Sequence, residues 1–95
     1  MRIEHDFLGN MEVPDDVYYG VQTMRAIENF NITGQKLDPD FIKALAVVKK
    51  AAALANMDTG RLPHEIGDVL VQAADEIIAG GLIDQFPVDP IQGGA

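Results

Sequence analysis

The chain has 95 residues, 47% of them hydrophobic but only 6% aromatic, and its 15 acidic and 7 basic residues give a formal charge of -8. This charge argues against nucleic acid or an anionic membrane as a partner, because both are bound through clustered Lys and Arg. The absence of cysteine excludes a disulfide framework and a thiol nucleophile, and it fits a cytoplasmic protein. The polar N-terminus, interrupted by charges, is not expected to be a signal peptide.

Residues 2–13 predict a short β-hairpin, because side chains of similar character alternate along them. The alternating residues are Ile3, His5, Phe7, Met11 and Val13. Gly9-Asn10 is the predicted turn between the two strands. Pro14 ends the hairpin, and Asp15 or Asp16 is expected to cap the next helix by accepting its free N–H groups.

A first helix is predicted from about Gln22 to Phe30. Its apolar residues at helical spacing are Val17, Val21, Met24 and Ile27. Gly20 weakens a helical turn by roughly 1 kcal/mol relative to alanine. We therefore expect residues 18–20 to form a structured loop before the helix.

A second helix is predicted to begin at Asp38-Pro39, a capping residue followed by proline at the first helical position. Most of its circumference is apolar, with only Lys43, Lys49 and Lys50 as interruptions. One stripe is Phe41, Leu45, Val48, Ala52 and Ala55, and the second is Ala44, Val47, Ala51 and Leu54. A helix of this kind is usually covered on several sides. We therefore expect exposed apolar surface from Asp38 to Met57 and a covering neighbour outside this chain.

A third helix is predicted between Pro63, again at the first helical position, and the left-handed stop at Gly80-Gly81. Gly60 ends the helix before it. Its predicted buried stripe is Ile66, Val69, Leu70, Ala73 and Ile77. From Leu82 onward the chain is predicted to be extended and irregular. The predicted fold is thus one mainly α domain, residues 1–95, with a short N-terminal β-hairpin and about three helices.

The usual catalytic and metal-binding patterns are missing from this sequence. His5 and His64 have no ligand spacing with acids, which favours ordinary strand and helix-start histidines over a metal site. Asp75 and Glu76 are adjacent and point to different faces of a helix. We therefore assign no catalytic residue, no metal ligand and no cofactor.

Arg25 and Lys49 are the remaining candidates for binding a substrate. The guanidinium of Arg25, between apolar neighbours, suits an anionic carboxylate, but its spacing equally fits a surface ion pair. Lys49, with Lys50, equally fits a lysine whose stem lies on an apolar helix and whose ammonium is in water.

Three collinear segments resemble the N-terminus of the aspartase/fumarase superfamily. They are residues 2–34, the stretch VVKKAAALAN at 47–56, and DQFPVDPIQGGA at 84–95. Residues 18–23 and 25–30 are similar to the aspartate ammonia-lyase branch, whereas class II fumarases more often have Trp-Gly-Ala-Gln-Thr there. Pro90 departs from some members of that branch.

The resemblance implies reversible elimination of ammonia from L-aspartate to give fumarate, without a cofactor. It implies a serine base on a later loop, and active sites assembled from several subunits of a homotetramer. Gln92–Ala95 would lead into a loop that binds the substrate carboxylate. The chain is therefore expected to be the N-terminal domain of a longer lyase, lacking the central bundle and the C-terminal domain, and inactive alone.

Within this resemblance, Arg25 matches a family arginine near the substrate, and Lys49 matches a family lysine with a supporting role. The implied partners are the rest of the enzyme chain, the other subunits and a small dicarboxylate substrate. Two alternatives stay open: part of a class II fumarase acting on malate and fumarate, and a stand-alone helical interaction module.

Overall fold

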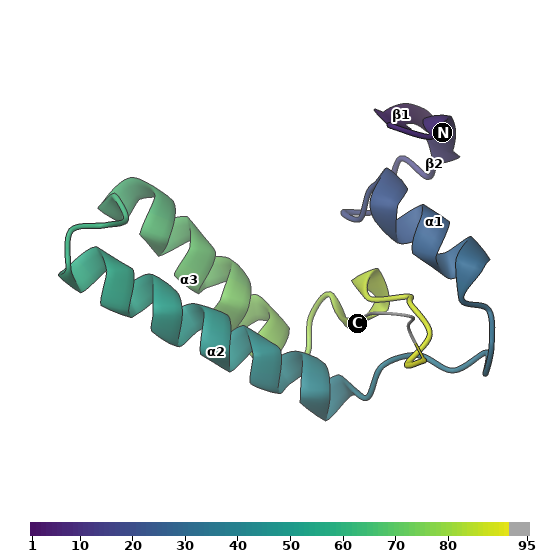
Figure 1. Ribbon diagram of the computed structural model, residues 1–95. Coiled ribbons are helices and arrows are strands. Elements are labelled where there is room, and N and C mark those ends of the chain that lie inside the picture. The colour runs from purple at the N-terminus through teal and green to yellow at the C-terminus, as the bar shows by residue number, and fades with distance from the viewer. Residues whose placement is uncertain (92–95) are drawn as a thin grey trace. The chain divides into compact units, whose positions relative to one another are not determined.

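A computed structural model of the chain describes residues 1–91, so the predicted loop at Gln92–Ala95 lies outside the described residues. The elements in chain order are β1 (Arg2–Asp6), β2 (Gly9–Val13), α1 (Val21–Asn29), α2 (Pro39–Asp58), α3 (His64–Ile78) and a 3₁₀ turn (Ile83–Gln85) (Figure 1). The predicted mainly α fold with an N-terminal hairpin is confirmed.

The chain divides into two compact units. The hairpin unit comprises residues 1–37 and the segment from residue 84 onward. The helical unit comprises residues 38–83. Each unit has its own internal contacts and is described separately.

Strands β1 and β2 are antiparallel, and Arg2 pairs with Val13 at one end while Asp6 pairs with Gly9 at the other. The turn is therefore Phe7-Leu8, and the prediction of a Gly9-Asn10 turn is wrong. The Asp6 carboxylate accepts a hydrogen bond from the Leu8 N–H at 3.0 Å, which closes the turn locally. Gly9 follows the turn at φ +115°, a conformation that favours glycine.

The alternation along the hairpin is confirmed, but the charged side chains occupy its inner face. Ile3 is 60% exposed on the outer face, together with His5. Arg2, Glu4 and Asp6 are half-buried on the inner face of β1. The hairpin is consequently attached to the rest of its unit through polar groups.

Helix α1 begins at Val21, one residue before the predicted start, and ends at Asn29. Gly20 is its N-cap residue and supplies no side-chain cap. The prediction that Asp15 or Asp16 caps this helix is wrong, since Glu4 of β1 accepts the Val21 N–H at 3.0 Å instead. An acidic side chain from a neighbouring strand thus satisfies one of the free N–H groups at the helix start.

Helix α2 begins as predicted. The Asp38 carboxylate accepts the Asp40 N–H at 2.9 Å, and Pro39 occupies the first helical position. Gly60, at φ +75°, follows the end of the helix. The prediction of Pro63 at the first position of α3 is off by one residue, because Pro63 is the N-cap of that helix.

Helices α2 and α3 run antiparallel side by side within the helical unit (Figure 1). Their contact is built mainly from small residues. The buried residues are Ile42, Ala46, Ala53 and Met57 of α2, with Gly67 and Ala74 of α3. A Cβ added to Gly67 would overlap the thioether of Met57, so glycine lets the two helices approach closely here.

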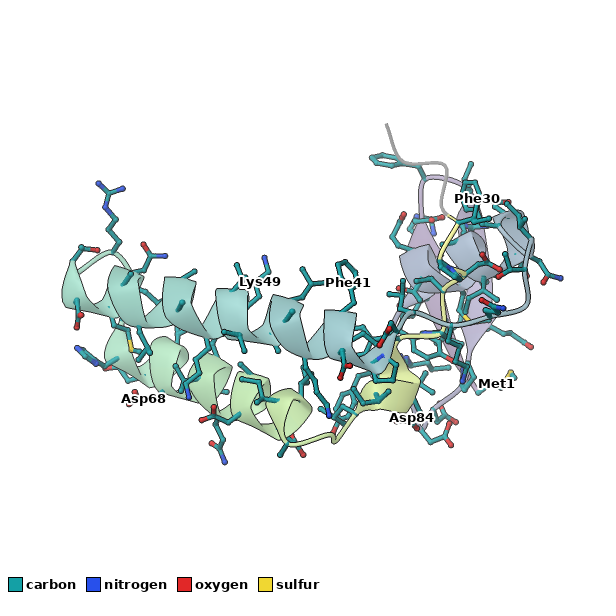
Figure 2. The ribbon with its side chains drawn as sticks, turned by 90° about the horizontal axis from the view of Figure 1, so that it is seen from below. Met1, Phe30, Phe41, Lys49, Asp68 and Asp84 are labelled. Carbon is teal, nitrogen blue, oxygen red and sulfur yellow. The ribbon has the colours of Figure 1, made fainter. Side chains whose placement is uncertain are left out.

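The predicted buried stripe of α3 is wrong, because its large residues face outward, as those of α2 do. Val48 of α2 and Val69 of α3 are each 63% exposed, and Leu70 is 49% exposed. Phe41, 53% exposed, projects from α2 away from α3 (Figure 2). Where several helix faces are apolar, periodicity cannot select the packed one, and the face of small residues allows the closest approach. The predicted exposed apolar surface on α2 is confirmed.

The stop after α3 is confirmed. Gly80 has φ +97°, and the Gly81 N–H donates to the Glu76 carbonyl at 3.0 Å, as in a Schellman motif. The prediction of irregular chain from Leu82 is wrong for the 3₁₀ turn at Ile83–Gln85. Along residues 1–91, no helix combines the length and hydropathy needed to span a membrane.

Candidate functional site

Arg25 of α1 forms a bidentate ion pair with Asp6 of β1. Its Nε and Nη2 donate to the two carboxylate oxygens at 2.7 and 2.9 Å, and Nη2 also donates to the Gly9 carbonyl at 3.2 Å. The side chains are 20% and 8% exposed. Paired planar groups in this geometry are fixed in direction as well as in distance.

The charges of both partners are stabilised by this pair. The hydrogen bond from Arg25 lowers the pKa of Asp6, which the Leu8 N–H lowers further. The hydrogen bond to Asp6 raises the pKa of Arg25. The sequence left two interpretations of Arg25, a ligand of a substrate carboxylate and a surface ion pair. The structure contains an ion pair with Asp6, and this pair is partly buried.

An open cavity of about 390 Å³ lies beside this pair, entirely within the hairpin unit. Gln22, Arg25 and Asn29 line it from one face of α1, as the spacing of three and four residues requires. Phe7 and Phe30 contribute apolar walls. Nη1 of Arg25 makes no hydrogen bond within residues 1–91, so the guanidinium retains donors for an anionic ligand.

Arg2 and Glu4, on the inner face of β1, form hydrogen bonds to the backbone that leads into α1. Arg2 donates to the carbonyls of Pro14, Val17 and Tyr19 at 2.6, 3.1 and 2.8 Å. Its Nε also donates to Glu4 at 2.6 Å, and this bond, with that from the Val21 N–H, lowers the pKa of Glu4. The predicted structured loop at residues 18–20 is therefore held by Arg2.

Lys49 lies on α2 in the helical unit. Its side chain (labelled in Figure 2) lines an open hollow of about 360 Å³ with Asn56 of α2, Leu62 and Leu70 of α3. It forms no ion pair among the described residues, whereas Lys50 pairs with Asp75 at 2.6 Å. The surroundings of Lys49 match those of a lysine lying on apolar helix surface.

Asp89 is buried, at 6% exposed, and holds the segment from residue 84 against the loop after α1. Its Oδ2 accepts the Thr33 N–H at 2.7 Å, the Thr33 hydroxyl at 2.9 Å and the Gly34 N–H at 3.1 Å. Its Oδ1 accepts the Ile91 N–H at 2.9 Å. Burial raises the pKa of Asp89, but these hydrogen bonds outweigh it and lower the pKa to about 2.

Sequence reasoning missed Glu4, Asp6 and Asp89 as structural partners. The charged residues at positions 2, 4 and 6 repeat with the strand period, and that signal indicated a polar strand face. No signal in the sequence links Asp89 to Thr33, because 56 positions separate them. Among residues 1–91, no group of three acidic or histidine side chains is close enough to hold a metal ion.

Comparison with known proteins identifies the family. The Lyase family profile matches residues 9–95. An aspartate ammonia-lyase from Bacillus sp. is 62% identical over the whole chain, which covers 20% of that protein. A class II fumarate hydratase from Halobacterium salinarum is 56% identical over 99% of the chain and 20% of its own length.

A solved structure, described as fumarate lyase:delta crystallin from Brucella melitensis in native form, has a TM-score of 0.90 and 47% identity. The match covers 99% of this chain and 22% of that protein. The chain thus spans about a fifth of the length of the relatives it matches. Because the profile matches nearly the whole chain, the chain belongs to the lyase family of the aspartase/fumarase superfamily.

Proposed function

We propose that this chain is the N-terminal domain of an aspartate ammonia-lyase, which reversibly eliminates ammonia from L-aspartate to give fumarate. The observation that carries this proposal is the 62% identity to an aspartate ammonia-lyase along the whole chain. The central and C-terminal domains are proposed to follow it, because the chain accounts for 20% of that relative.

Elimination of this kind places negative charge on a substrate carboxylate when a base removes the neighbouring proton. Such charge is stabilised by donors that are already oriented before the reaction. In this chain, Arg25 is the side chain suited to that task. Its guanidinium is oriented by Asp6 and lines the cavity of the hairpin unit.

The proposed activity is tested by the ultraviolet absorbance of fumarate formed from L-aspartate. The chain is assayed alone and as part of a longer protein that includes the following coding sequence. The longer protein is expected to be active and the 95-residue chain inactive. Turnover by the 95 residues alone would contradict the assignment of catalysis to later domains.

The role of Arg25 is tested in the longer protein by Arg25→Ala. We expect the KM for aspartate to rise about tenfold or more, since a charged hydrogen bond to a carboxylate contributes about 1.5–3 kcal/mol. Arg61→Ala is the matched control, because Arg61 is exposed in the connection between α2 and α3. Equal KM values for the two variants would mean that Arg25 serves only in the ion pair with Asp6.

Lys49 is proposed to have a smaller, supporting role in substrate binding. Lys49→Met keeps the apolar stem and removes the charge, so we expect a smaller rise in KM than for Arg25→Ala. A rise equal to that of Arg25→Ala would make Lys49 a direct ligand. No change in KM would leave it as a surface lysine.

A class II fumarase is the second candidate, supported by the 56% identity to the fumarate hydratase from Halobacterium salinarum. The two reactions share fumarate as product and differ in the leaving group. Assaying malate in parallel with aspartate separates them. Fumarate formed from malate but not from aspartate would favour the second candidate.

The proposed partners are the remainder of the same chain and other subunits of a cytoplasmic homotetramer. The outward apolar faces of α2 and α3 support this, since Val48 and Val69 are each 63% exposed. We expect Val69→Lys in the longer protein to lower the tetramer fraction in light scattering. Gln72→Lys, which adds the same charge at an exposed polar position, is the control. An undiminished tetramer in Val69→Lys would show that this face lies outside the interface.

A further inference from the structure

The segment that begins at residue 84 is fastened at two points that flank α1. At one, the Gln85 side chain accepts the Tyr18 N–H at 2.7 Å, just before the helix. At the other, Asp89 accepts hydrogen bonds from Thr33 and Gly34, just after it. These two contacts hold the segment to the backbone on both sides of α1.

Asp89 connects two backbone segments, because its two carboxylate oxygens accept hydrogen bonds from different donors. Oδ2 takes three donors from Thr33 and Gly34, where Gly34 has φ +72° and successive N–H groups turn toward one acceptor. Oδ1 takes the N–H of Ile91 and so fixes the turn of the chain two residues further on. One side chain thereby links the loop after α1 to the backbone at Ile91.

A carboxylate is required for this arrangement. An asparagine has a single acceptor oxygen, so it could serve either the Thr33–Gly34 loop or Ile91, and its NH₂ group would face the other donor. Asp89→Asn therefore breaks one of the two links while leaving size and shape nearly unchanged. The variant therefore tests the hydrogen bonds of Asp89 without a large change in the packing of its side chain.

We propose that Asp89 is a positioning residue for the lyase reaction: it fixes the backbone at Ile91 relative to the loop after α1, the helix that carries Arg25. This inference rests on the proposed function, in which Arg25 binds substrate and the later part of the chain supplies the remaining groups. Both partners of the link, Asp89 and the α1 loop, belong to the hairpin unit. Misplacement of reacting groups by about 1 Å can lower a rate by about 10²-fold, so a loosened link has a kinetic effect.

The test uses the longer lyase and compares Asp89→Asn with Asp84→Asn, an exposed aspartate in the same segment. Both are assayed well below their melting temperatures. A positioning role predicts that kcat/KM of Asp89→Asn falls at least tenfold, with a raised KM, while Asp84→Asn keeps the wild-type values. A purely structural role predicts a lower melting temperature with KM unchanged, and that result would overturn the proposal.

Thr33→Val provides a milder variant if Asp89→Asn does not fold. It removes the hydroxyl donor and keeps both backbone donors. We expect a smaller rise in KM in the same direction, and no change in KM would count against the proposal.

Failure of the proposed function is recognised separately. If the wild-type longer protein forms no fumarate from aspartate or malate, the reaction assignment is wrong. Hydrogen exchange in the 95-residue chain then decides the structural claim. Asp89→Asn should accelerate exchange of the Gly34 or Ile91 amide about tenfold relative to Asp84→Asn, and equal exchange would refute the link through Asp89.

Discussion

The two units of this chain are stabilised by opposite means. In the hairpin unit, Glu4 and Asp89 accept hydrogen bonds from backbone N–H groups. Asp6 forms an ion pair with Arg25. In the helical unit, α2 and α3 meet through small apolar residues around Gly67. Hydrogen bonds to charged groups fix direction, whereas a contact between small side chains fixes mainly distance.

This difference bears on function. The hairpin unit, in which Arg25 is paired with Asp6, presents an open cavity beside Arg25. The helical unit leaves its larger apolar residues on the surface, with Val48 and Val69 each 63% exposed. A surface of that kind is expected to be covered by other protein. We therefore propose that the first unit contributes to ligand binding and the second to assembly.

The largest expected effect comes from enlarging the contact between α2 and α3. Gly67→Val places side-chain atoms where Met57 lies, and overpacking of this kind costs about 1–3 kcal/mol. Ala73→Val on an exposed position of α3 is the control and should cost under about 1 kcal/mol. Urea unfolding followed by circular dichroism measures both. Equal losses would show that Gly67 is not at a close contact.

The second-largest expected effect is a loss of stability of the hairpin unit at low pH. The pKa of Asp89 is about 2 in the folded chain, below its ordinary value of 3.8, so its contribution to stability is complete above about 3.8. This contribution is lost as the pH falls toward 2. The lowered pKa values of Glu4 and Asp6 act in the same direction.

Unfolding free energies between pH 2 and pH 5 should therefore fall less steeply toward acid in Asp89→Asn than in wild type. Asp84→Asn should keep the wild-type slope, because Asp84 is exposed. Identical slopes in wild type and Asp89→Asn would mean that the buried hydrogen bonds of Asp89 do not stabilise the folded state.

A smaller and more diagnostic effect is expected at Gly20. A Cβ there would lie 2.6 Å from the Glu4 carboxylate oxygen, so Gly20→Ala should disturb the cap on α1 and destabilise the chain. In a Glu4→Ala background the space is free, and the same change should stabilise by about 0.4–1 kcal/mol through the unfolded state. A double-mutant cycle measures this reversal of sign. Equal effects in both backgrounds would remove Glu4 as the cap.

The smallest effect is expected from the ion pair between Lys50 and Asp75. The two side chains are 36% and 50% exposed, and exposed pairs contribute about 0.2–1 kcal/mol at most. Lys50→Met should therefore change the free energy of unfolding by less than about 1 kcal/mol, and less at high salt. A larger loss of unfolding free energy would mean that ion pairs stabilise the helical unit as they do the hairpin unit.

The element order and most boundaries were predictable because their signals are local. Asp38-Pro39 begins α2, and Gly60 and Gly80 follow helix ends in the left-handed conformation. Such features depend on the conformational preferences of a few neighbouring residues. Arg25 was likewise singled out by sequence, and the structure places it beside a cavity.

What only the tertiary structure decided is which groups meet. The sequence alone determined a hairpin and apolar helices, but the packed faces of α2 and α3 follow from the close approach that Gly67 permits. The partnerships of Glu4 with α1 and of Asp89 with Thr33 join positions 17 and 56 residues apart. Contacts over such distances depend on how the whole chain satisfies its buried polar groups, and no local pattern encodes them.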